Sequence, residues 1–225
     1  MRSRYADKFN HDEDADDYDR DVLDESHPVR EGYDALLNWV AQRSTQYPHR
    51  ALLELGVGSG NLSLRLPAFD SLLAVDVSAK MLALAQKKLA ARTGVDYAQT
   101  DLLQFFDTQR FGREAQFDQV LSTYAIHHLT EDEKPVLFKA IKQVLRPRGV
   151  ALFGDLMFAD AEAGLRYLSQ CRQQQMRDFA DDIEDEFFWN LSSARAQLEA
   201  LGFTLRCKQF SPLSWGVEAS LASLA

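Results

Sequence analysis

The sequence has little cysteine and no long apolar run. Its two cysteines, Cys171 and Cys207, lie in no metal-binding or redox spacing, and two thiols cannot build the dense disulfide framework of a small secreted domain. The longest apolar stretches, such as residues 51–55 and 150–153, are far too short to cross a bilayer, which needs about 20 residues. We therefore expect reduced cysteines that pack in the core, and no membrane-spanning segment.

Clustered basic residues are also missing. The 225-residue chain carries a formal net charge of -9, and its few basic clusters, such as Lys87-Lys88, are typical of solvated surface. Because a nucleic acid backbone is held chiefly by clustered Lys and Arg, the composition argues against a nucleic acid partner. Residues 1–7 contain no apolar signal-peptide core, so we expect a cytoplasmic location.

Three common catalytic signatures are absent from the sequence. It contains no Gly-x-x-x-x-Gly-Lys-Ser/Thr phosphate loop, no His-Glu-x-x-His metal motif and no Gly-x-Ser-x-Gly nucleophile elbow. His11, His27 and His49 are isolated in the sequence and do not suggest a metal site. We expect no bound metal.

Acidic residues are concentrated in a leader, residues 1–28. Nine of the fourteen residues from Asp12 to Glu25 are acidic, with Tyr18 and Val22-Leu23 as the main apolar positions. Such a segment is either a disordered, solubilising extension or a flap whose Tyr18 and Asp19 fold over a bound ligand. The sequence leaves both interpretations open. A single domain is expected over residues 29–225.

The rest of the chain alternates between short apolar runs and helical patterns. Runs typical of buried strands occupy residues 51–55, 72–75, 97–98, 117–121 and 150–153. Helical spacing of apolar residues covers 29–46, 79–92 and 131–145. Two late runs, 203–210 and 213–224, lie close enough to form an antiparallel hairpin. We therefore predict an α/β fold, with a Rossmann-like, doubly wound, mostly parallel sheet of seven strands and this hairpin at its edge.

A mostly helical insertion, residues 161–201, separates the fifth predicted strand from the hairpin. Simple packing would explain its amphipathic pattern. It also follows the C-terminal end of a central strand, where ligands of open parallel sheets bind. We therefore expect it to form a helical cap over the substrate.

A glycine-rich loop follows the first predicted strand. The strand end at Glu54 runs into Gly56, Gly58 and Gly60, and glycine at these positions permits positive φ and lets a ligand approach the main chain. A dinucleotide loop would need its third glycine where Asn61 stands, which weakens the interpretation as a nicotinamide oxidoreductase. The Gly-x-Gly-x-Gly spacing instead resembles motif I of class I S-adenosylmethionine-dependent methyltransferases.

Acidic residues follow the next two predicted strands. Asp76 lies twenty residues after Gly56, where a carboxylate can accept hydrogen bonds from both ribose hydroxyls, although it can also help to cap the helix that begins at Ala79. Asp101 reaches the same crevice by the same topology. In the family that the loop resembles, this acid contacts the adenine amino group; an ordinary turn or helix N-cap is the alternative.

The resemblance extends to Ser122-Thr123-Tyr124-Ala125-Ile126-His127-His128-Leu129-Thr130 and Gly154-Asp155-Leu156-Met157-Phe158, which look like the YrrT group of bacterial methyltransferases. It implies methyl transfer from S-adenosylmethionine (SAM), with S-adenosylhomocysteine (SAH) as product. The glycine loop, Asp76, Asp101 and the predicted cap together lead us to expect a small-molecule acceptor. The cofactor-binding residues that the resemblance implies are Tyr18, Glu54, Gly56, Gly58, Gly60, Asn61, Asp76, Val77, Met81, Asp101, Leu102, Ser122 and Tyr124. A non-catalytic SAM sensor or scaffold is the alternative, and the sequence does not distinguish a monomer from a homodimer.

Methyl transfer from a sulfonium needs little acid–base chemistry. The leaving group is a neutral thioether, so in-line positioning and exclusion of water can supply much of the acceleration. If the acceptor must lose a proton, His127, His128 and Asp155 are the candidate catalytic groups at the ends of the fourth and fifth strands. Packing beside the cofactor is the alternative role of the two histidines.

Overall fold

The computed structural model describes residues 1–12, 15–107 and 116–221. Its strands are β1 (Ala51–Leu55), β2 (Ser71–Asp76), β3 (Val95–Gln99), β4 (Phe117–Thr123), β5 (Leu145–Phe158), β6 (Trp189–Asn190), β7 (Phe203–Gln209) and β8 (Ser214–Leu221). Its helices are α1 (Ala15–Asp21), α2 (Tyr33–Ser44), α3 (Asn61–Arg65), α4 (Ala79–Lys88), α5 (Leu102–Asp107), α6 (Glu133–Val144), α7 (Ala161–Gln173), α8 (Arg177–Asp185) and α9 (Leu191–Ala200), with a 3-10 turn η1 (Ile126–His128). Residues 222–224 of the predicted hairpin and residues 13–14 of the leader lie outside the described residues.

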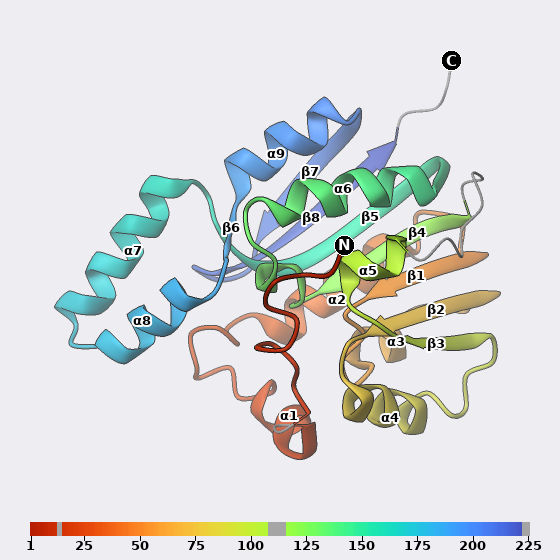
Figure 1. Cartoon of the computed structure of the whole chain (residues 1–225), viewed down its shortest axis with the longest axis horizontal. Helices are drawn as coiled ribbons and strands as arrows, with labels where there is room; N and C mark the ends of the chain where they lie inside the picture. Colours follow the sequence, from red (N-terminus) through yellow and green to blue (C-terminus); the bar gives the residue numbers. More distant parts are fainter. Residues whose placement is uncertain (13–14, 108–115, 222–225) are drawn as a thin grey trace.

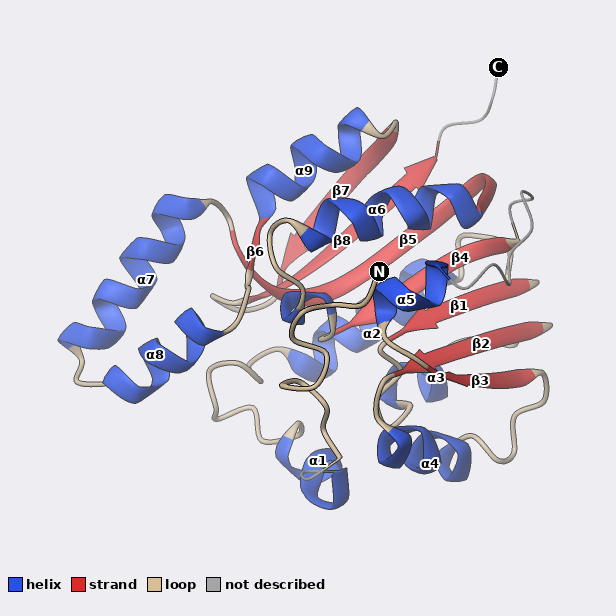
Figure 2. Cartoon of the chain, in the orientation of Figure 1, coloured by secondary structure: helices blue, strands red, loops and turns tan. Residues whose placement is uncertain are grey.

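The sheet runs in the order β3-β2-β1-β4-β5-β8-β7 (Figures 1 and 2). The first five strands in this order are parallel, while β8 is antiparallel to both β5 and β7. This order confirms the doubly wound sheet of seven strands with an antiparallel C-terminal hairpin at its edge. The two-residue strand β6 also pairs with β5, which the sequence analysis did not predict. The predicted strand at 150–153 is the middle of the longer β5, Leu145–Phe158.

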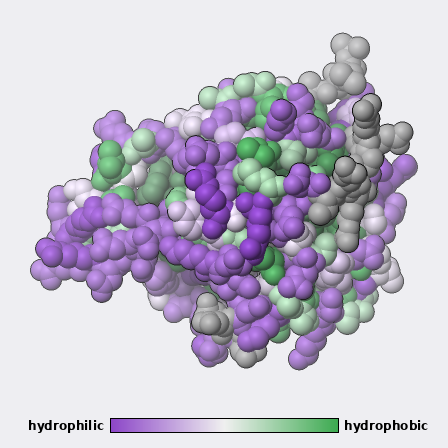
Figure 3. Space-filling model, viewed as in Figure 1, coloured by the Kyte–Doolittle hydropathy of each residue, from purple (hydrophilic) through white to green (hydrophobic). Residues whose placement is uncertain are grey.

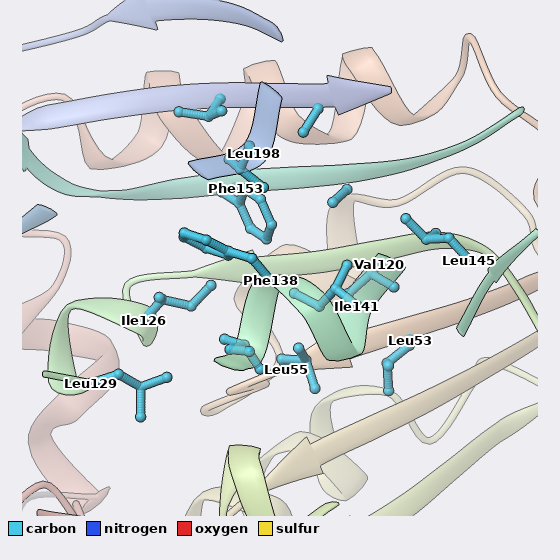
Figure 4. Packing of buried hydrophobic residues seen from close by; sticks show 14 of the residues in the cluster. Leu53, Leu55, Val120, Ile126, Leu129, Phe138, Ile141, Leu145, Phe153 and Leu198 are labelled. Atoms are coloured by element: carbon cyan, nitrogen blue, oxygen red, sulfur yellow. The ribbon is translucent and has the colours of Figure 1, made fainter. Parts of the chain in front are cut away.

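Two layers of helices cover the sheet, because strand side chains alternate between its faces. One core cluster joins Leu53 of β1 to residues of α5, α6 and α9. Phe138 of α6 and Phe153 of β5 meet there, with ring centroids 6.1 Å apart (Figure 4). A second cluster joins Leu52, one residue earlier in β1, to α2 and α3 on the opposite face. This sandwich leaves the C-terminal ends of the parallel strands as the open edge.

The insertion at 161–201 contributes to two different parts of the fold. Helices α7 and α8 project away from the sheet on the left of Figure 1, and the face of this projection in Figure 3 is largely hydrophilic. Helix α9 instead packs on β7 and the core, because its apolar residues Leu191, Ala194 and Leu198 are buried there. The segment that stands out from the sheet is therefore α7 and α8 without α9. No helix in the described residues has the length and apolar character needed to span a membrane.

The leader crosses the C-terminal edge of the sheet (Figure 1). The N–H of Ser3 donates to Asp101, just after β3, over 3.0 Å. Asp12 accepts from the Ser78 hydroxyl (2.6 Å) and the Lys80 N–H (3.1 Å), at the start of α4. The described part of the leader is thus attached to the ends of two strands that carry predicted site residues.

Candidate functional site

A pocket lies at the C-terminal ends of β1 to β4, and its volume, counted together with the solvent-open space at its mouth, is about 840 Å³. The predicted site residues that line it are Tyr18, Gly56, Gly58, Asn61, Asp76, Val77, Met81, Asp101, Leu102, Tyr124 and His128. The other predicted residues lie within the described range but outside the lining: Glu54, Gly60, Ser122, His127 and Asp155. The structure therefore brings together residues from four strand ends and from the leader.

The glycine loop has the backbone that its sequence predicts. Gly56, Gly58 and Gly60 have φ of 71°, 53° and 86°, in the left-handed region that favours glycine. A Cβ at Gly56 would collide with the side chain of Ala125, whereas a Cβ at Gly58 would meet only the Tyr18 hydroxyl, at 3.9 Å. Gly58 therefore leaves open space beside the main chain, in which a ligand fits.

Asp76 faces the pocket and also braces this loop. Its carboxylate accepts the N–H of Gly58 over 2.8 Å and that of Ser78 over 2.9 Å. Burial raises the pKa of Asp76, and these two hydrogen bonds oppose that rise. The N-cap of α4 is Ser78, whose hydroxyl accepts the N–H of Met81. Asp76 is therefore not the residue that caps this helix.

Asp101 lines the pocket and caps a helix as well. Its Oδ1 accepts the N–H groups of Ser3, Leu103 and Gln104, each over 3.0 Å. Leu103 and Gln104 lie in the first turn of α5, so Asp101 does make the hydrogen bonds expected of a helix N-cap. The bond to Ser3 adds a tie to the leader that sequence reasoning missed.

Three of the predicted cofactor residues support the loop from below. Glu54 is fully buried, accepts a hydrogen bond from the Ser63 hydroxyl, and has its pKa raised by burial from 4.5 to about 8. The hydroxyl of Ser122 donates to the Leu55 carbonyl over 2.8 Å. A Cβ at Gly60 would lie 3.4 Å from atoms of α4, so glycine allows this helix to pack closely. None of the three lines the pocket, because the side chains of Glu54 and Ser122 are bonded to Ser63 and Leu55 instead.

Asp155 and His127 form a buried pair behind the pocket. One carboxylate oxygen of Asp155 accepts the N–H groups of Ile126 (2.9 Å) and His127 (3.1 Å), together with the indole N–H of Trp189 (3.2 Å). The other oxygen contacts Nδ1 of His127 and accepts the Leu156 N–H. The prediction that both side chains reach the reacting groups is not supported by this geometry, because the pair is turned into the core to hold η1.

His128 is the member of the predicted catalytic set that lines the pocket. Its ring stacks on Phe9 of the leader, with centroids 4.2 Å apart. Its Nδ1 is buried and has no hydrogen-bond partner among the described residues. Burial lowers the pKa of His128 well below 6.5, so the imidazole is neutral near pH 7. A neutral ring nitrogen without a partner can accept a hydrogen bond, and the lowered pKa makes it a weak proton acceptor.

Tyrosine rings form the wall at the β4 end of the pocket. Tyr124 has a φ of 50°, unusual for a non-glycine residue, and its hydroxyl lies 3.1 Å from that of Ser214. The ring centroids of Tyr124 and of Tyr33, at the start of α2, lie 5.1 Å apart. Tyr18 also lines the pocket and lies close to Gly58. Tyr33 was missed as a site residue, because the helical spacing of 29–46 marks it only as an apolar position.

The leader supplies a further wall that the sequence analysis did not locate. Ser3, Tyr5, Ala6, Phe9 and His11 line the pocket. Only the spacing of the two aromatic residues by four positions hints that this stretch has an apolar side. Their contacts join residues about a hundred positions apart, which local patterns do not reveal.

Asp19 attaches α1 to the glycine loop. Its carboxylate accepts from the Lys88 ammonium (2.7 Å) and from the side chains of Ser59 and Asn61. Lys88 also donates to Ser59 and Asn61, which closes a network between leader, loop and α4. Burial raises the pKa of Asp19, but the bonds from Lys88 and Ser59 outweigh it and hold the pKa below the ordinary value. We call these four residues the latch.

Comparisons with known proteins identify the family of this chain. A family model described as "Methyltransferase domain" matches residues 52–149, which include the glycine loop, Asp76 and Asp101. An uncharacterized methyltransferase of Oceanobacillus iheyensis is 33% identical over 192 residues, covering 85% of this chain and 84% of the relative. The uncharacterized methyltransferase YrrT of Bacillus subtilis is 31% identical over 189 residues, covering 84% of each chain. This chain belongs to that methyltransferase family.

The fold of the methyltransferase also matches solved structures. The magnesium protoporphyrin IX methyltransferase of Synechocystis PCC 6803, solved with bound SAH, aligns with a TM-score of 0.68 at 18% identity, covering 94% of this chain and 96% of that one. The methyltransferase is an enzyme whose cofactor is SAM. Its pocket fits this cofactor, because Gly58 leaves open space beside the loop and two carboxylates stand at neighbouring strand ends.

Proposed function

We propose that this enzyme transfers the methyl group of SAM directly, in line, to a small-molecule acceptor held beneath the leader. The observation that carries the proposal is the partly covered pocket, one wall of which comes from the leader: Ser3, Tyr5, Ala6, Phe9, His11 and Tyr18. Ser3 and the latch tie this wall down on two sides. A site partly covered by the enzyme's own chain favours an acceptor that fits inside it over an exposed position on a macromolecule. The net charge of -9 further disfavours nucleic acid.

The cofactor residues in this proposal follow the strand ends. Asp76 would hold the ribose hydroxyls, Asp101 and Leu102 would contact the adenine, and the main chain at Gly56 and Gly58 would lie along the methionyl part. When bound, SAM supplies a methyl group already activated by the sulfonium. The contribution of the chain is then to orient the two reactants and to exclude water.

The acceptor side in this proposal is the neutral, aromatic part of the pocket. Tyr124 and Phe9 would pack against the acceptor, and the unpartnered Nδ1 of His128 would accept a hydrogen bond that orients it. Asp155 and His127 are positioning residues, because they hold the η1 turn from which His128 projects. A catalytic role is therefore proposed for His128 alone of the three predicted residues.

The test is to incubate the enzyme with methyl-labelled SAM and a whole-cell extract, then to separate dialysable from macromolecular material. We expect the label to appear in a dialysable compound other than SAM, and this product to be lost with the Asp76→Asn variant run in parallel. Label in protein or nucleic acid would overturn the small-molecule assignment. Tight binding of SAM with no labelled product in either fraction would instead indicate a sensor.

A further inference from the structure

The pocket has an orientation that follows the order of the strands. Asp101 follows β3, Asp76 ends β2, Gly56 follows β1 and Tyr124 follows β4, and the sheet places these strands side by side in that order. If the adenosine part of the cofactor lies at the acidic β3 and β2 end, its amino-acid part lies at the β1 and β4 end. There the α-carboxylate of SAM needs a positive partner, because an unpaired charge in a partly buried site is costly.

The lining itself does not provide this partner. Among the described residues that line the pocket, the Asp and Glu side chains are Asp76 and Asp101, and there is no Lys or Arg. Lys88 approaches the loop, but its ammonium already donates to Asp19, Ser59 and Asn61. An ammonium has three donors, so these contacts occupy it fully.

Arg30 lies next to Tyr18, outside the lining of the pocket. Its guanidinium carbon is 6.0 Å from the ring centroid of Tyr18, a residue of the lining. Burial raises the pKa values of Tyr33 and Tyr124, and the positive charge of Arg30 acts against that rise at both residues. Its charge also adds to the fall of the pKa of His128. The positive charge is therefore felt across the β4 end of the pocket.

Arg30 is half-buried and has no ion pair with any carboxylate in the described ranges. The chain has 34 acidic residues, and other arginines of this region are paired: Arg20 with Asp17 and Arg65 with Asp34. The main chain of Arg30 is fixed, because its N–H donates to His27 and its carbonyl accepts from Tyr33. A held but unpaired guanidinium beside a pocket is a ready binding group for a carboxylate.

We propose that Arg30 binds the α-carboxylate of SAM. Its fork of N–H donors matches a carboxylate and would neutralise the one negative group of the cofactor. Tyr18 lies close to both Arg30 and Gly58, so the same contact fastens the leader over the bound cofactor. This inference rests on the cofactor alone and is independent of which acceptor is methylated.

The experiment is calorimetric titration with two ligands, SAM and decarboxylated SAM, which lacks only the carboxylate. For Arg30→Met we expect the Kd of SAM to rise roughly 10- to 100-fold, the effect of losing a charge-assisted hydrogen bond or pair. The Kd of decarboxylated SAM should stay unchanged. Arg30→Lys should retain part of the affinity for SAM. Arg166→Met, on the projecting helix α7, is the matched control and should bind both ligands like the wild type.

Two outcomes would overturn the assignment. An equal loss of affinity for both ligands would show that Arg30 only supports the fold of the pocket, and an unchanged Kd for SAM would show that its guanidinium does not reach the carboxylate. If Arg30→Met does not fold, Arg30→Lys carries the same comparison. A loss in Arg30→Lys that does not discriminate between the two ligands then overturns the proposal.

Discussion

The buried Glu54 beneath the glycine loop gives the fold a specific dependence on pH. Burial raises its folded-state pKa from 4.5 to about 8, and the nearby charge of Asp76 adds to the rise that the Ser63 hydrogen bond opposes. Between these two values the folded chain holds a proton that the unfolded chain has released. Stability from this group is therefore complete below pH 4.5, falls as the pH rises towards about 8, and is then constant.

The size of this effect follows from the shift. At about 1.4 kcal/mol per pH unit, a pKa raised from 4.5 to about 8 corresponds to a loss of about 5 kcal/mol across the window. Glu54→Gln has the same shape and no charge. We expect the variant to match the wild type near pH 4.5 and to become progressively more stable than it towards pH 8.

The assay is urea unfolding of both proteins at a series of pH values across this window. Other titrating groups are common to both proteins and cancel in the difference of their unfolding free energies. Glu162→Gln is the matched control, because its side chain is 80% exposed and should give a difference close to zero throughout. Parallel stability curves for Glu54→Gln and the wild type would refute the reasoning, since Glu54 would then be ionised in the folded protein.

Three further changes test other parts of the site. Lys88→Met should speed the hydrogen exchange of leader amides, because it breaks the ion pair with Asp19. The cost in stability should be about 1 kcal/mol or less, because Asp19 is partly exposed. The control Lys87→Met should leave this exchange unchanged, and equal exchange in both variants would argue against the latch. Asp155→Asn should lower the free energy of unfolding by roughly 2–4 kcal/mol, because an amide cannot accept all the hydrogen bonds that this carboxylate accepts. A difference of less than about 1 kcal/mol in urea unfolding would contradict this expectation. His128→Asn should slow turnover by roughly 100-fold or more at saturating SAM, with little change in the calorimetric Kd of SAM; unaltered turnover would remove His128 from the reaction.

Local patterns were sufficient to predict the fold and the cofactor loop. The buried strands appear in the sequence as short apolar runs, and the cofactor loop appears as glycines that follow Glu54. Both patterns are visible because each is formed by residues adjacent in the sequence. Asp76 and Asp101 were placed at the pocket because parallel strands end at one edge. In a parallel sheet the C-terminal ends of the strands meet at one edge, so the positions of residues that directly follow a strand can be predicted.

The sequence analysis was less successful where side chains depend on contacts distant in the sequence. No local sequence pattern indicates that Ser3 binds Asp101. Nor does one indicate that the Asp155 carboxylate is hydrogen-bonded by η1 and Trp189 instead of facing a ligand. The same holds for Glu54, whose side chain points below the loop that its motif defines. Arg30 was overlooked because an isolated arginine carries no signal until its lack of a partner is visible in three dimensions.

Binding of SAM in the pocket that Asp76 borders is the central claim and can be measured directly. Calorimetric titration of the wild type, Asp76→Asn and the exposed control Asp70→Asn with SAM tests it in one measurement. We predict that the wild type and Asp70→Asn bind SAM alike, and that Asp76→Asn binds it at least roughly 10-fold more weakly, as expected for loss of a charged hydrogen-bond acceptor. Absence of binding to the wild type at millimolar SAM, or equal affinity in all three proteins, would contradict the account.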